Sequence, residues 1–407
     1  MIDISARSLV RLMQASHTAT LEQLPELIAE HAAAAGMHDA AVFVVDIRET
    51  VLRRLTGRGP AAWSGGQEFS VSGSLPGQAY QRVELLPEPE RPTGGRRPGG
   101  RRWWVAVTDG VERLGVLRAD TDTDTEPVRQ ALRDLASMTA LLLLSKRSFS
   151  DSYARLVRTE PMNVAAEMQW NLTPPPAYAG HDVTVGAVME PAYQIGGDAF
   201  DYAVAGSTLH MGVFDAMGHD TTAGITANVA VSACRNARRQ GASLTETSEL
   251  VEQTLIEQFS TSRYVTAILA DLDMATGRLT WINRGHHLPI LIRGNRWTTE
   301  LACPPAGPMG TDLGLPVTMA AVQLEPGDRL LLYTDGIVEA RDALGTEFGR
   351  KRFVDFILRH HSGGHILHET LRRLMSALLE HHGGGLDDDA TVLLTEWRCG
   401  HQQELTP

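Results

Sequence analysis

Residues 189–220 read MEPAYQIGGDAFDYAVAGSTLHMGVFDAMGHD, and the second half of the chain can be interpreted from this segment. Apolar residues lead into Asp198 and Asp215. The pattern therefore predicts a glycine turn and hairpin strands that carry both carboxylates to one rim of a sheet. Gly196 and Gly197 allow close backbone approach at that rim. Two carboxylates on rigid strand ends suit a hard divalent cation. A hairpin can also carry Gly-Gly-Asp for its turn alone, so residues downstream have to decide between the two interpretations.

The rest of the second half alternates between grouped strands and paired helices. The predicted strands are 264–273, 278–283, 290–293, 317–324, 329–334 and 390–397, and the predicted helices are 220–240, 243–260, 350–361 and 366–382. Hairpin turns join the strands in pairs, at 274–277 and 325–328. This grouping indicates an α+β fold of antiparallel sheets covered by helices, and not a doubly wound parallel sheet.

Acidic residues recur at the ends of the predicted strands. Asp335 follows one strand, and Asp388 and Asp389 precede the last. A single Asp at a strand end is usually a cap or a turn former. Together with Asp198 and Asp215, however, these residues make four acidic positions, with adjacent Asp388 and Asp389 taken as one, and each position is at the edge of a core strand. Their mutual repulsion would cost several kcal/mol without cations, so the pattern predicts bound Mg²⁺ or Mn²⁺.

The acidic positions belong to an ordered set of motifs that resembles a known family. The set consists of residues 196–198 (GGD), 214–219 (FDAMGH), 333–340 (YTDGIVEA) and 388–391 (DDAT), with secondary motifs at 264–267 (YVTA), 283–286 (NRGH) and 345–349 (GTEFG). It resembles the signature of the PPM-type (type 2C) serine/threonine phosphatases, in the bacterial branch of the SpoIIE and RsbU phosphatases. The resemblance covers roughly residues 180–398. It implies a β-sandwich of two antiparallel sheets flanked by helices, with two Mn²⁺ or Mg²⁺ ions at one end.

The resemblance also implies roles for individual residues. Asp215 would be shared by both ions, and the backbone carbonyl of Ala216 would join it. Asp335 and Asp388 would hold one ion, and Asp198 would act directly or through a water. Either Asp388 or Asp389 could be the direct ligand, because related enzymes carry Asn or Asp at the second position.

Four further residues are weaker candidates. Asp201 is expected to be a turn residue, His219 to cap or orient a helix, and His286 to serve packing. Asp220 stands where this branch usually has Gly, which puts the entry into the next helix in question if that position needs positive φ. No basic residue can be assigned to the substrate phosphate.

Residues 1–125 are predicted to form a small α/β sensor domain. Helical spacing covers 5–35, and strands are expected at 40–47, 51–55, 103–107 and 114–118. Residues 87–102 (PEPERPTGGRRPGGRR) are too rich in Pro, Gly and Arg to be buried. We therefore expect a solvated loop rather than a phosphate-binding site formed by its arginines. The order of elements resembles a GAF-type domain, whose ligand is unknown. A small molecule or a protein could be its signal.

Residues 126–172 are predicted to form a helical linker. Val128, Leu135, Leu142, Phe149 and Leu156 recur every seven residues along one expected helix that runs to residue 169, broken at most at Pro161. Two interpretations stay open: a parallel coiled coil, which would make a homodimer, or a helix packed on its own sensor domain. Residues 173–176 (TPPP) then mark the start of a phosphatase domain that extends to residue 400.

Composition restricts the class of protein. The 407 residues are 43% hydrophobic and 21% charged, as in ordinary globular proteins, and the net charge of −12 argues against nucleic-acid or anionic-membrane binding. Cys234, Cys303 and Cys399 are too widely spaced for a zinc site or a disulfide framework. The start lacks a signal-peptide pattern, and the longest apolar run, at 140–144, is too short for a membrane span. These features predict a cytoplasmic protein.

The sequence therefore predicts a metal-dependent protein phosphatase that hydrolyses phosphoserine or phosphothreonine with metal-activated water. The family branch implies a regulatory substrate, an anti-sigma factor antagonist of the STAS type. Two alternatives remain: a non-catalytic relay that uses a phosphatase-like fold to bind a partner, and a hydrolase of small phosphate esters.

Overall fold

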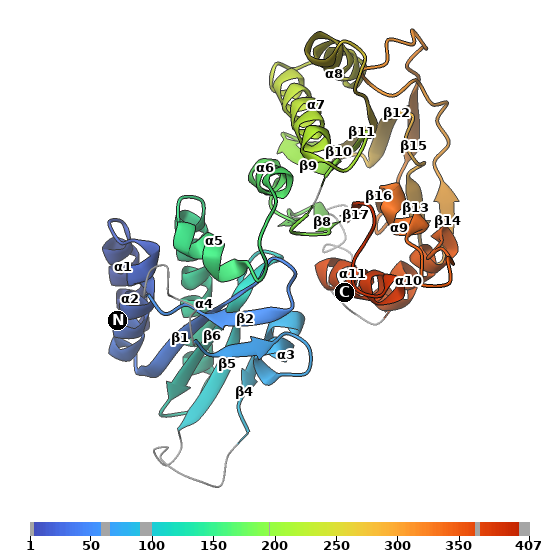
Figure 1. Ribbon diagram of the computed structural model, residues 1–407. Helices are drawn as coiled ribbons and strands as arrows, with labels where there is room; N and C mark the ends of the chain where they lie inside the picture. Colours follow the sequence, from blue (N-terminus) through green and yellow to red (C-terminus); the bar gives the residue numbers. More distant parts are fainter. Residues whose placement is uncertain (1–3, 58–65, 90–99, 195, 363–366, 399–407) are drawn as a thin grey trace. The chain divides into compact units, whose positions relative to one another are not determined.

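The computed structural model describes residues 4–57, 66–89, 100–194, 196–362 and 367–398. The chain divides into two compact units, Met1–Pro161 and Met162–Pro407 (Figure 1). Most of the predicted loop 87–102 lies outside the described residues, as does Cys399.

A six-stranded antiparallel sheet forms the centre of the N-terminal unit. Its order is β3-β2-β1-β6-β5-β4. The strands are β1 (Met37–Val45), β2 (Val51–Arg54), β3 (Glu68–Ser70), β4 (Leu85–Pro87), β5 (Arg101–Asp109) and β6 (Glu112–Thr121). The helices are α1 (Ile4–Ser16), the 3-10 turn η1 (Leu21–Gln23), α2 (Leu24–Ala34), α3 (Leu75–Arg82), α4 (Glu126–Arg147) and α5 (Asp151–Val157).

Residues of this sheet alternate between two cores, because successive strand side chains point to opposite faces. On β1, Val42 and Val44 pack with α1, α2 and α4, whereas Phe43 and Val45 pack in a second cluster with Tyr80 of α3. Both faces of the sheet are therefore covered. This arrangement is compatible with the predicted sensor domain.

The expected single helix over 126–169 is wrong. The chain forms α4, α5 and α6 (Val164–Leu172), which are separated by short breaks. Leu135 and Leu142, two of the heptad positions, are buried in the N-terminal core beside α1 and α2. Phe149, in contrast, is 70% exposed. Because its apolar stripe packs on its own sheet, α4 matches the second of the two interpretations left open. A dimer stays a prediction.

The helix α6 belongs to the C-terminal unit, not to a linker. Ala166 joins the main core of that unit, and the indole N–H of Trp170 donates to the carbonyl of Ala192 at 2.7 Å. The division between the units, at Pro161 and Met162, therefore falls inside the segment 126–172 that the sequence predicts to be a linker.

Two antiparallel sheets form the C-terminal unit, with strand orders β15-β12-β11-β10-β9 and β14-β13-β16-β17-β8-β7. The strands are β7 (Ala177–Ala179), β8 (Val183–Glu190), β9 (Asp198–Ala205), β10 (Thr208–Ala216), β11 (Val265–Asp273), β12 (Arg278–Arg284), β13 (Ile290–Arg293), β14 (Trp297–Glu300), β15 (Met319–Gln323), β16 (Arg329–Tyr333) and β17 (Ala390–Trp397). The helices besides α6 are α7 (Thr221–Arg239), α8 (Leu244–Phe259), α9 (Asp335–Glu339), α10 (Arg350–Ser362) and α11 (Leu367–His382).

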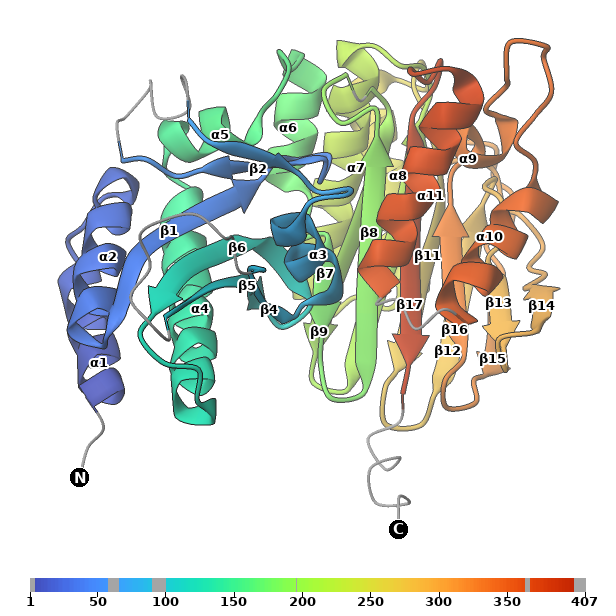
Figure 2. The same cartoon turned by 90° about the horizontal axis from the view of Figure 1, so that it is seen from below.

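The layers follow from three hydrophobic clusters. The largest cluster lies between the sheets and joins β8, β16 and β17 to β9–β12. A second cluster packs α7 and α8 on the outer face of the five-stranded sheet, and a third packs α10 and α11 on the outer face of the other sheet. Figures 1 and 2 show the two helix pairs on opposite sides of the paired sheets. This α-β-β-α sandwich confirms the predicted fold class.

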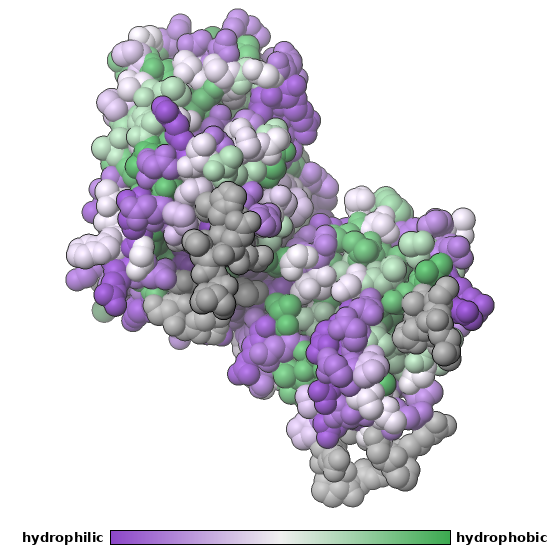
Figure 3. All heavy atoms as spheres, turned by 180° about the vertical axis from the view of Figure 1, so that it is seen from behind, coloured by the Kyte–Doolittle hydropathy of each residue, from purple (hydrophilic) through white to green (hydrophobic). Residues whose placement is uncertain are grey.

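The surface of the two units is mixed in character. On the face that Figure 3 shows, hydrophilic residues are interspersed with smaller hydrophobic areas. Within the described part of the chain, no helix combines the length and the apolar character that a membrane crossing requires. Cys234 and Cys303 are free thiols buried in the C-terminal unit.

Candidate metal centre

The hairpin of β9 and β10 places Asp198 and Asp215 directly opposite each other. They are paired residues of adjacent antiparallel strands. Side chains two residues apart share a face of a strand, and Phe200 and Val213 on these strands belong to the core between the sheets. Asp198 and Asp215 therefore face the same inter-sheet space, at the end of the strands, as the sequence predicted.

The second sheet brings its acidic residues to the same end. Asp335 begins α9 and is separated from β16 by Thr334 alone, and Asp388 and Asp389 immediately precede β17, the strand paired with β16. The backbone N–H of Thr334 donates to the carbonyl of Thr391 at 3.0 Å, which extends the ladder to the rim. The buried hydroxyl of Thr334 donates to Asp198 at 2.6 Å. The two sheets are thus joined by a hydrogen bond inside the acidic cluster.

Asp389 is held by the backbone of the glycine turn. Its Oδ2 atom accepts hydrogen bonds from the N–H groups of Gly196 (2.8 Å), Gly197 (2.6 Å) and Asp198 (3.2 Å). A Cβ atom on Gly197 would clash with the carbonyl oxygen of Ala216, so glycine is required for this close approach. Asp389 is 4% exposed, whereas Asp388 is an exposed residue.

Burial and mutual repulsion raise the pKa values of these carboxyl groups. Burial raises the pKa of Asp215 to about 7, and the charges of Asp335 and Asp388 add to the shift. The pKa of Asp198 lies well above its ordinary value because of burial and the charges of Asp389 and Asp215. Burial also raises the pKa of Asp389 to about 6, against the effect of the backbone N–H groups, and raises that of Asp388. The cluster is therefore poorly compensated by the protein itself.

This donor set fits divalent cations. The described residues include no Arg or Lys that forms an ion pair with any of the five aspartates. Carboxylate oxygens are the ligands that Mg²⁺ and Mn²⁺ prefer, and a cation would offset the repulsion that raises the pKa values. The chemistry of the cluster thus agrees with the two ions that the family resemblance implies.

His286 connects three segments beneath this centre. Its Nε2 atom lies 3.0 Å from the carbonyl of Tyr333, and its Nδ1 atom lies 2.8 Å from the hydroxyl of Thr266. A carbonyl can only accept, so Nε2 carries the proton and Nδ1 accepts from Thr266. Burial lowers the pKa of His286 to about 4, which keeps the ring neutral. Thr266 pairs with Asp215 across β10 and β11, so His286 positions the strand ends.

Two expectations about neighbouring aspartates are corrected. Asp201 is not a turn residue, because it lies within β9, is 1% exposed and forms ion pairs with Arg235 (2.6 Å) and Arg238 (2.8 Å). Asp220 has φ of −101°, so the position does not need glycine, and its carboxylate caps α7 by accepting from the N–H of Ala223 at 2.9 Å. The positive φ occurs at Gly218 (+92°).

Comparisons with known proteins agree with this geometry. Residues 205–398 match the family model described as stage II sporulation protein E (SpoIIE). The C-terminal unit is thus similar to the SpoIIE branch of the PPM-type phosphatases, as its motifs predicted. The match includes Asp215, Asp335, Asp388 and Asp389, and Asp198 lies seven residues before its start.

Individual relatives of this chain are distant. Protein IcfG of Synechocystis is 28% identical over 102 residues, which cover 24% of this chain and 16% of IcfG. Phosphoserine phosphatase RsbU of Bacillus subtilis is 20% identical over 234 residues, which cover 57% of this chain and 69% of RsbU. The crystal structure of the RsbU and RsbW domains of Rv1364c from Mycobacterium tuberculosis has a TM-score of 0.47 at 24% identity and covers 53% of this chain and 62% of that chain.

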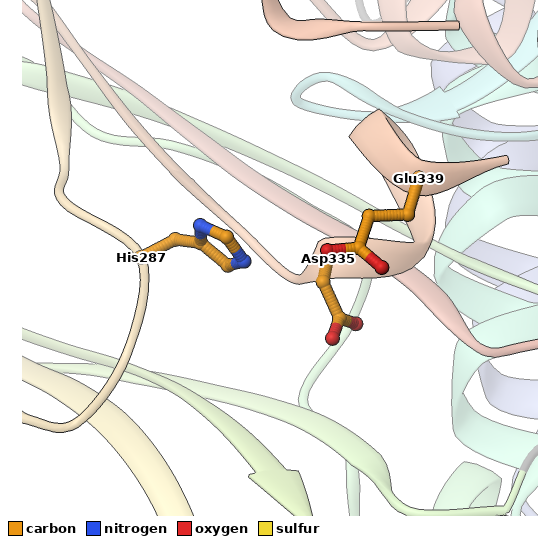
Figure 4. Close-up of side chains that lie close together, drawn as sticks. All are labelled: His287, Asp335 and Glu339. Carbon is orange, nitrogen blue, oxygen red and sulfur yellow. The ribbon is translucent and has the colours of Figure 1, made fainter. Parts of the chain in front are cut away.

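Three residues near the centre were not foreseen, and two of them, His287 and Glu339, lie beside the predicted Asp335. The ligand atoms of His287, Asp335 and Glu339 all lie within 4.8 Å of one another. Figure 4 shows His287 reaching from the loop after β12 toward the two carboxylates on α9. Glu339 could have been found from its place four residues after Asp335, on the same helix face. His287 gives no such signal, because its approach depends on a contact between distant segments.

Arg263 is the third unforeseen residue. It lies between α8 and β11, and its Nη1 atom donates to the carbonyl of Met217 at 3.3 Å, in the loop that follows Asp215. Arg263 also contributes to lowering the pKa of Asp220, after the hydrogen bond from Ala223. A cation therefore lies on the rim of the acidic centre without an ion pair to its aspartates.

Proposed function

We propose that this protein is a metal-dependent phosphatase that hydrolyses phosphoserine or phosphothreonine on a regulatory protein. The observation that carries the proposal is the convergence of Asp198, Asp215, Asp335 and Asp388 at one rim of a SpoIIE-family sandwich. The fold itself does not require these acidic side chains to lie together, since their mutual repulsion opposes folding.

Asp215, the carbonyl of Ala216, Asp335 and Asp388 would hold two Mn²⁺ or Mg²⁺ ions. Such ions lower the pKa of water toward neutrality and stabilise negative charge on a phosphoryl group. Asp198 would contribute through its own oxygen or through a water. Asp389 would act as a positioning residue, because its carboxylate is occupied by the backbone N–H groups of the glycine turn.

Other residues of the chain would orient this centre and the substrate. His286 and Thr334 fix the strand ends that carry Asp215 and Asp335. Arg263 would attract the phosphate of the substrate, a role for which the sequence alone indicates no basic residue. Its guanidinium is anchored by one hydrogen bond to Met217, so donors remain on the group for a phosphate.

A covalent phosphoenzyme is not expected. Cys234 is buried in the helix α7, and burial raises its pKa to about 12, so the thiol stays protonated. Burial also raises the pKa of Cys303. With no activated thiol among the described residues of the C-terminal unit, water is the expected nucleophile.

The substrate and the setting are inferred from the family branch. RsbU, a relative of this chain, is named a phosphoserine phosphatase. We infer a phosphorylated anti-sigma factor antagonist of the STAS type as substrate, a cytoplasmic location, and a signal received by the N-terminal unit as a GAF-like sensor. A purely partner-binding relay would not need to retain four clustered carboxylates that destabilise the fold.

Phosphate release from a phosphorylated STAS protein tests the proposal. We expect release with Mn²⁺, none after EDTA treatment, and none from Asp215→Ala. In ¹⁸O-labelled water, each phosphate formed in a single turnover should carry one solvent oxygen. Equal activity in EDTA and in Mn²⁺ would refute the metal mechanism, and a trapped phosphoenzyme would refute direct attack by water. Release from small esters but from no phosphoprotein would favour a hydrolase of small phosphate esters.

A further inference from the structure

The loop between β14 and β15 carries apolar side chains on the outside of the C-terminal unit. Leu313 and Leu315 of this loop are 60% and 53% exposed. We propose that these two leucines, together with Met217, form a docking surface for apolar residues that flank the phosphorylated serine or threonine of a protein substrate. This inference rests on the proposed function, which it deepens by naming a feature of the substrate.

The exposure of the two leucines is selective within their own loop. Val317, two residues after Leu315, packs against the hydrophobic cluster that lies beneath α7 and α8. An apolar side chain of this loop can therefore reach the core. Single exposed hydrophobic residues are common on protein surfaces, but two leucines at alternate positions beside an inward-packed valine form a small apolar surface that a partner can cover.

The loop is joined to the segment that carries Arg263. Met309 exchanges two backbone hydrogen bonds with Val265, at 2.8 and 2.9 Å. A Cβ atom on Gly310 would clash with the carbonyl oxygen of Arg263. The start of the loop therefore lies directly against residues 263–265.

Met217 lies on the other edge of the same segment. Its N–H donates to the carbonyl of Tyr264 at 3.1 Å, and its carbonyl accepts from Arg263 at 3.3 Å. Val265 pairs with Ala216 on one edge and with Met309 on the other, so residues 263–265 lie between 216–217 and 309–310. Met217 is two residues after Asp215 and is 41% exposed. The docking surface therefore borders the segment of Arg263 beside the metal centre.

The backbone that presents the leucines is fixed. Gly310, Asp312 and Gly314 have positive φ values of +98°, +54° and +61°. A residue other than glycine adopts this conformation where surrounding contacts hold it, and the N–H of Asp312 donates to Glu252 of α8 at 3.0 Å. Figure 1 shows the loop after β14 passing beside α8 before it returns to β15. A surface that is ordered before binding loses little conformational entropy when it is covered.

The chemistry of this region indicates the kind of ligand it would recognise. The guanidinium of Arg263 offers donors to a phosphate, whereas leucine and methionine side chains offer only apolar contacts. A ligand that uses both carries apolar side chains next to its phosphate, as a phosphorylated protein segment can and a small polar ester cannot. Covering one leucine side chain corresponds to about tenfold or more in affinity.

Binding of two fluorescent peptides to the full-length protein, followed by fluorescence anisotropy with Mn²⁺ present, tests this proposal. Both peptides carry a non-hydrolysable phosphonate analogue of phosphoserine, which is flanked on both sides by leucines in one peptide and by serines in the other. We expect the wild type to bind the leucine peptide about tenfold more tightly, and the double variant Leu313→Ser/Leu315→Ser to lose this preference.

Two further variants serve as controls. The double variant Leu313→Met/Leu315→Met should keep the preference for the leucine peptide, because methionine is apolar and similar in volume to leucine. Val204→Ser is the matched surface control. Val204 is also an exposed apolar residue, at 39%, but it lies near the end of β9 that is opposite to Asp198, so this variant should bind both peptides as the wild type does.

Equal affinities of the two peptides for the wild type would overturn the docking surface, and so would a preference that persists in the double serine variant or disappears in Val204→Ser. A wild-type oligomer that dissociates in the double serine variant, measured by sedimentation, would assign the leucines to a contact between copies of the chain and would also refute the proposal. Phosphate release from a phosphorylated STAS protein is measured separately. Its absence beside the expected peptide preference would refute the proposed function alone.

Discussion

The carboxylate of Asp198 accepts a hydrogen bond of 2.6 Å from the hydroxyl of Thr334, the residue that immediately precedes Asp335. The hydroxyl oxygen of Thr334 in turn accepts from the backbone N–H of Thr391 at 2.9 Å. Thr334 is fully buried. Asp198 begins β9 in the five-stranded sheet, and Thr391 lies on β17 in the six-stranded sheet. One hydroxyl thus fixes the positions of two candidate ligands.

Replacement of this hydroxyl should destabilise the domain. Thr334→Val keeps the shape but removes one hydrogen bond from buried Asp198 and the side-chain acceptor of the N–H of Thr391, which should lower the free energy of unfolding by about 1–3 kcal/mol. Thr334→Ser keeps the hydroxyl and serves as the control. Urea unfolding measures both variants. A valine variant as stable as the serine variant would show that the hydrogen bond contributes nothing.

Asp388 and Asp389 should differ in what they support. Asp388→Asn should weaken Mn²⁺ binding with little change in stability, because Asp388 is exposed. Asp389→Ala should cost about 3 kcal/mol or more, since it removes the acceptor for three buried N–H groups. Asp389→Asn keeps one acceptor oxygen, so its stability should lie between those of the wild type and Asp389→Ala. Calorimetric Mn²⁺ titration and thermal unfolding separate the two roles, and the reverse pattern would make Asp389 the direct ligand.

Arg263 should affect substrate binding more than the chemical step. Arg263→Ala should raise KM for a phosphoprotein by about tenfold, because a charge-assisted contact to phosphate is lost, and should change kcat less. Arg263→Lys keeps the positive charge, so it should raise KM less than Arg263→Ala does. Arg278→Ala is the control, because Arg278 is exposed at the opposite end of the sheet. Equal KM values in Arg263→Ala and Arg278→Ala would exclude a role in phosphate binding.

Asp201 contributes to stability and not to the metal centre. Its side chain points away from Asp198, toward Arg235 and Arg238 of α7. Asp201→Asn leaves two partly buried guanidinium groups without a counter-charge, so we expect a loss of about 3–5 kcal/mol. The number of Mn²⁺ ions bound should be unchanged. An unaltered melting temperature would contradict this assignment, and so would fewer bound ions.

The sequence predicted those parts of the site that depend on local order along the chain. Asp215 lies at the end of an apolar strand and Asp335 follows one closely, and a strand end can be recognised from its own residues. The contact of Asp389 with the Gly196 turn joins residues 193 apart, and nothing in either segment specifies the other. The partners of Asp201 were missed for the same reason. For α4, a seven-residue repeat did not distinguish packing on a partner chain from packing on its own sheet, because both bury the same stripe.

The stability of the metal-free protein should fall as pH rises toward neutrality. Burial, together with the charges of Asp335, Asp388 and Asp389, raises the pKa of Asp215 to about 7. In the unfolded chain the pKa of an aspartate is about 3.9. Between these values the folded protein binds more protons than the unfolded chain, so a rise in pH through this window favours unfolding.

The test of this prediction compares wild type with Asp215→Asn in EDTA, by melting temperature from about pH 4 to about pH 7. The comparison removes contributions of opposite sign, such as that of His286, whose pKa is lowered to about 4 and whose contribution to stability is lost as pH falls. We expect the melting temperature of the wild type to decrease relative to that of the variant as pH rises. Mn²⁺ should reverse the decrease in the wild type alone, because a bound cation compensates for the ionised carboxylate. Parallel pH profiles for the two proteins would show that Asp215 is not held in a repulsive, proton-binding environment.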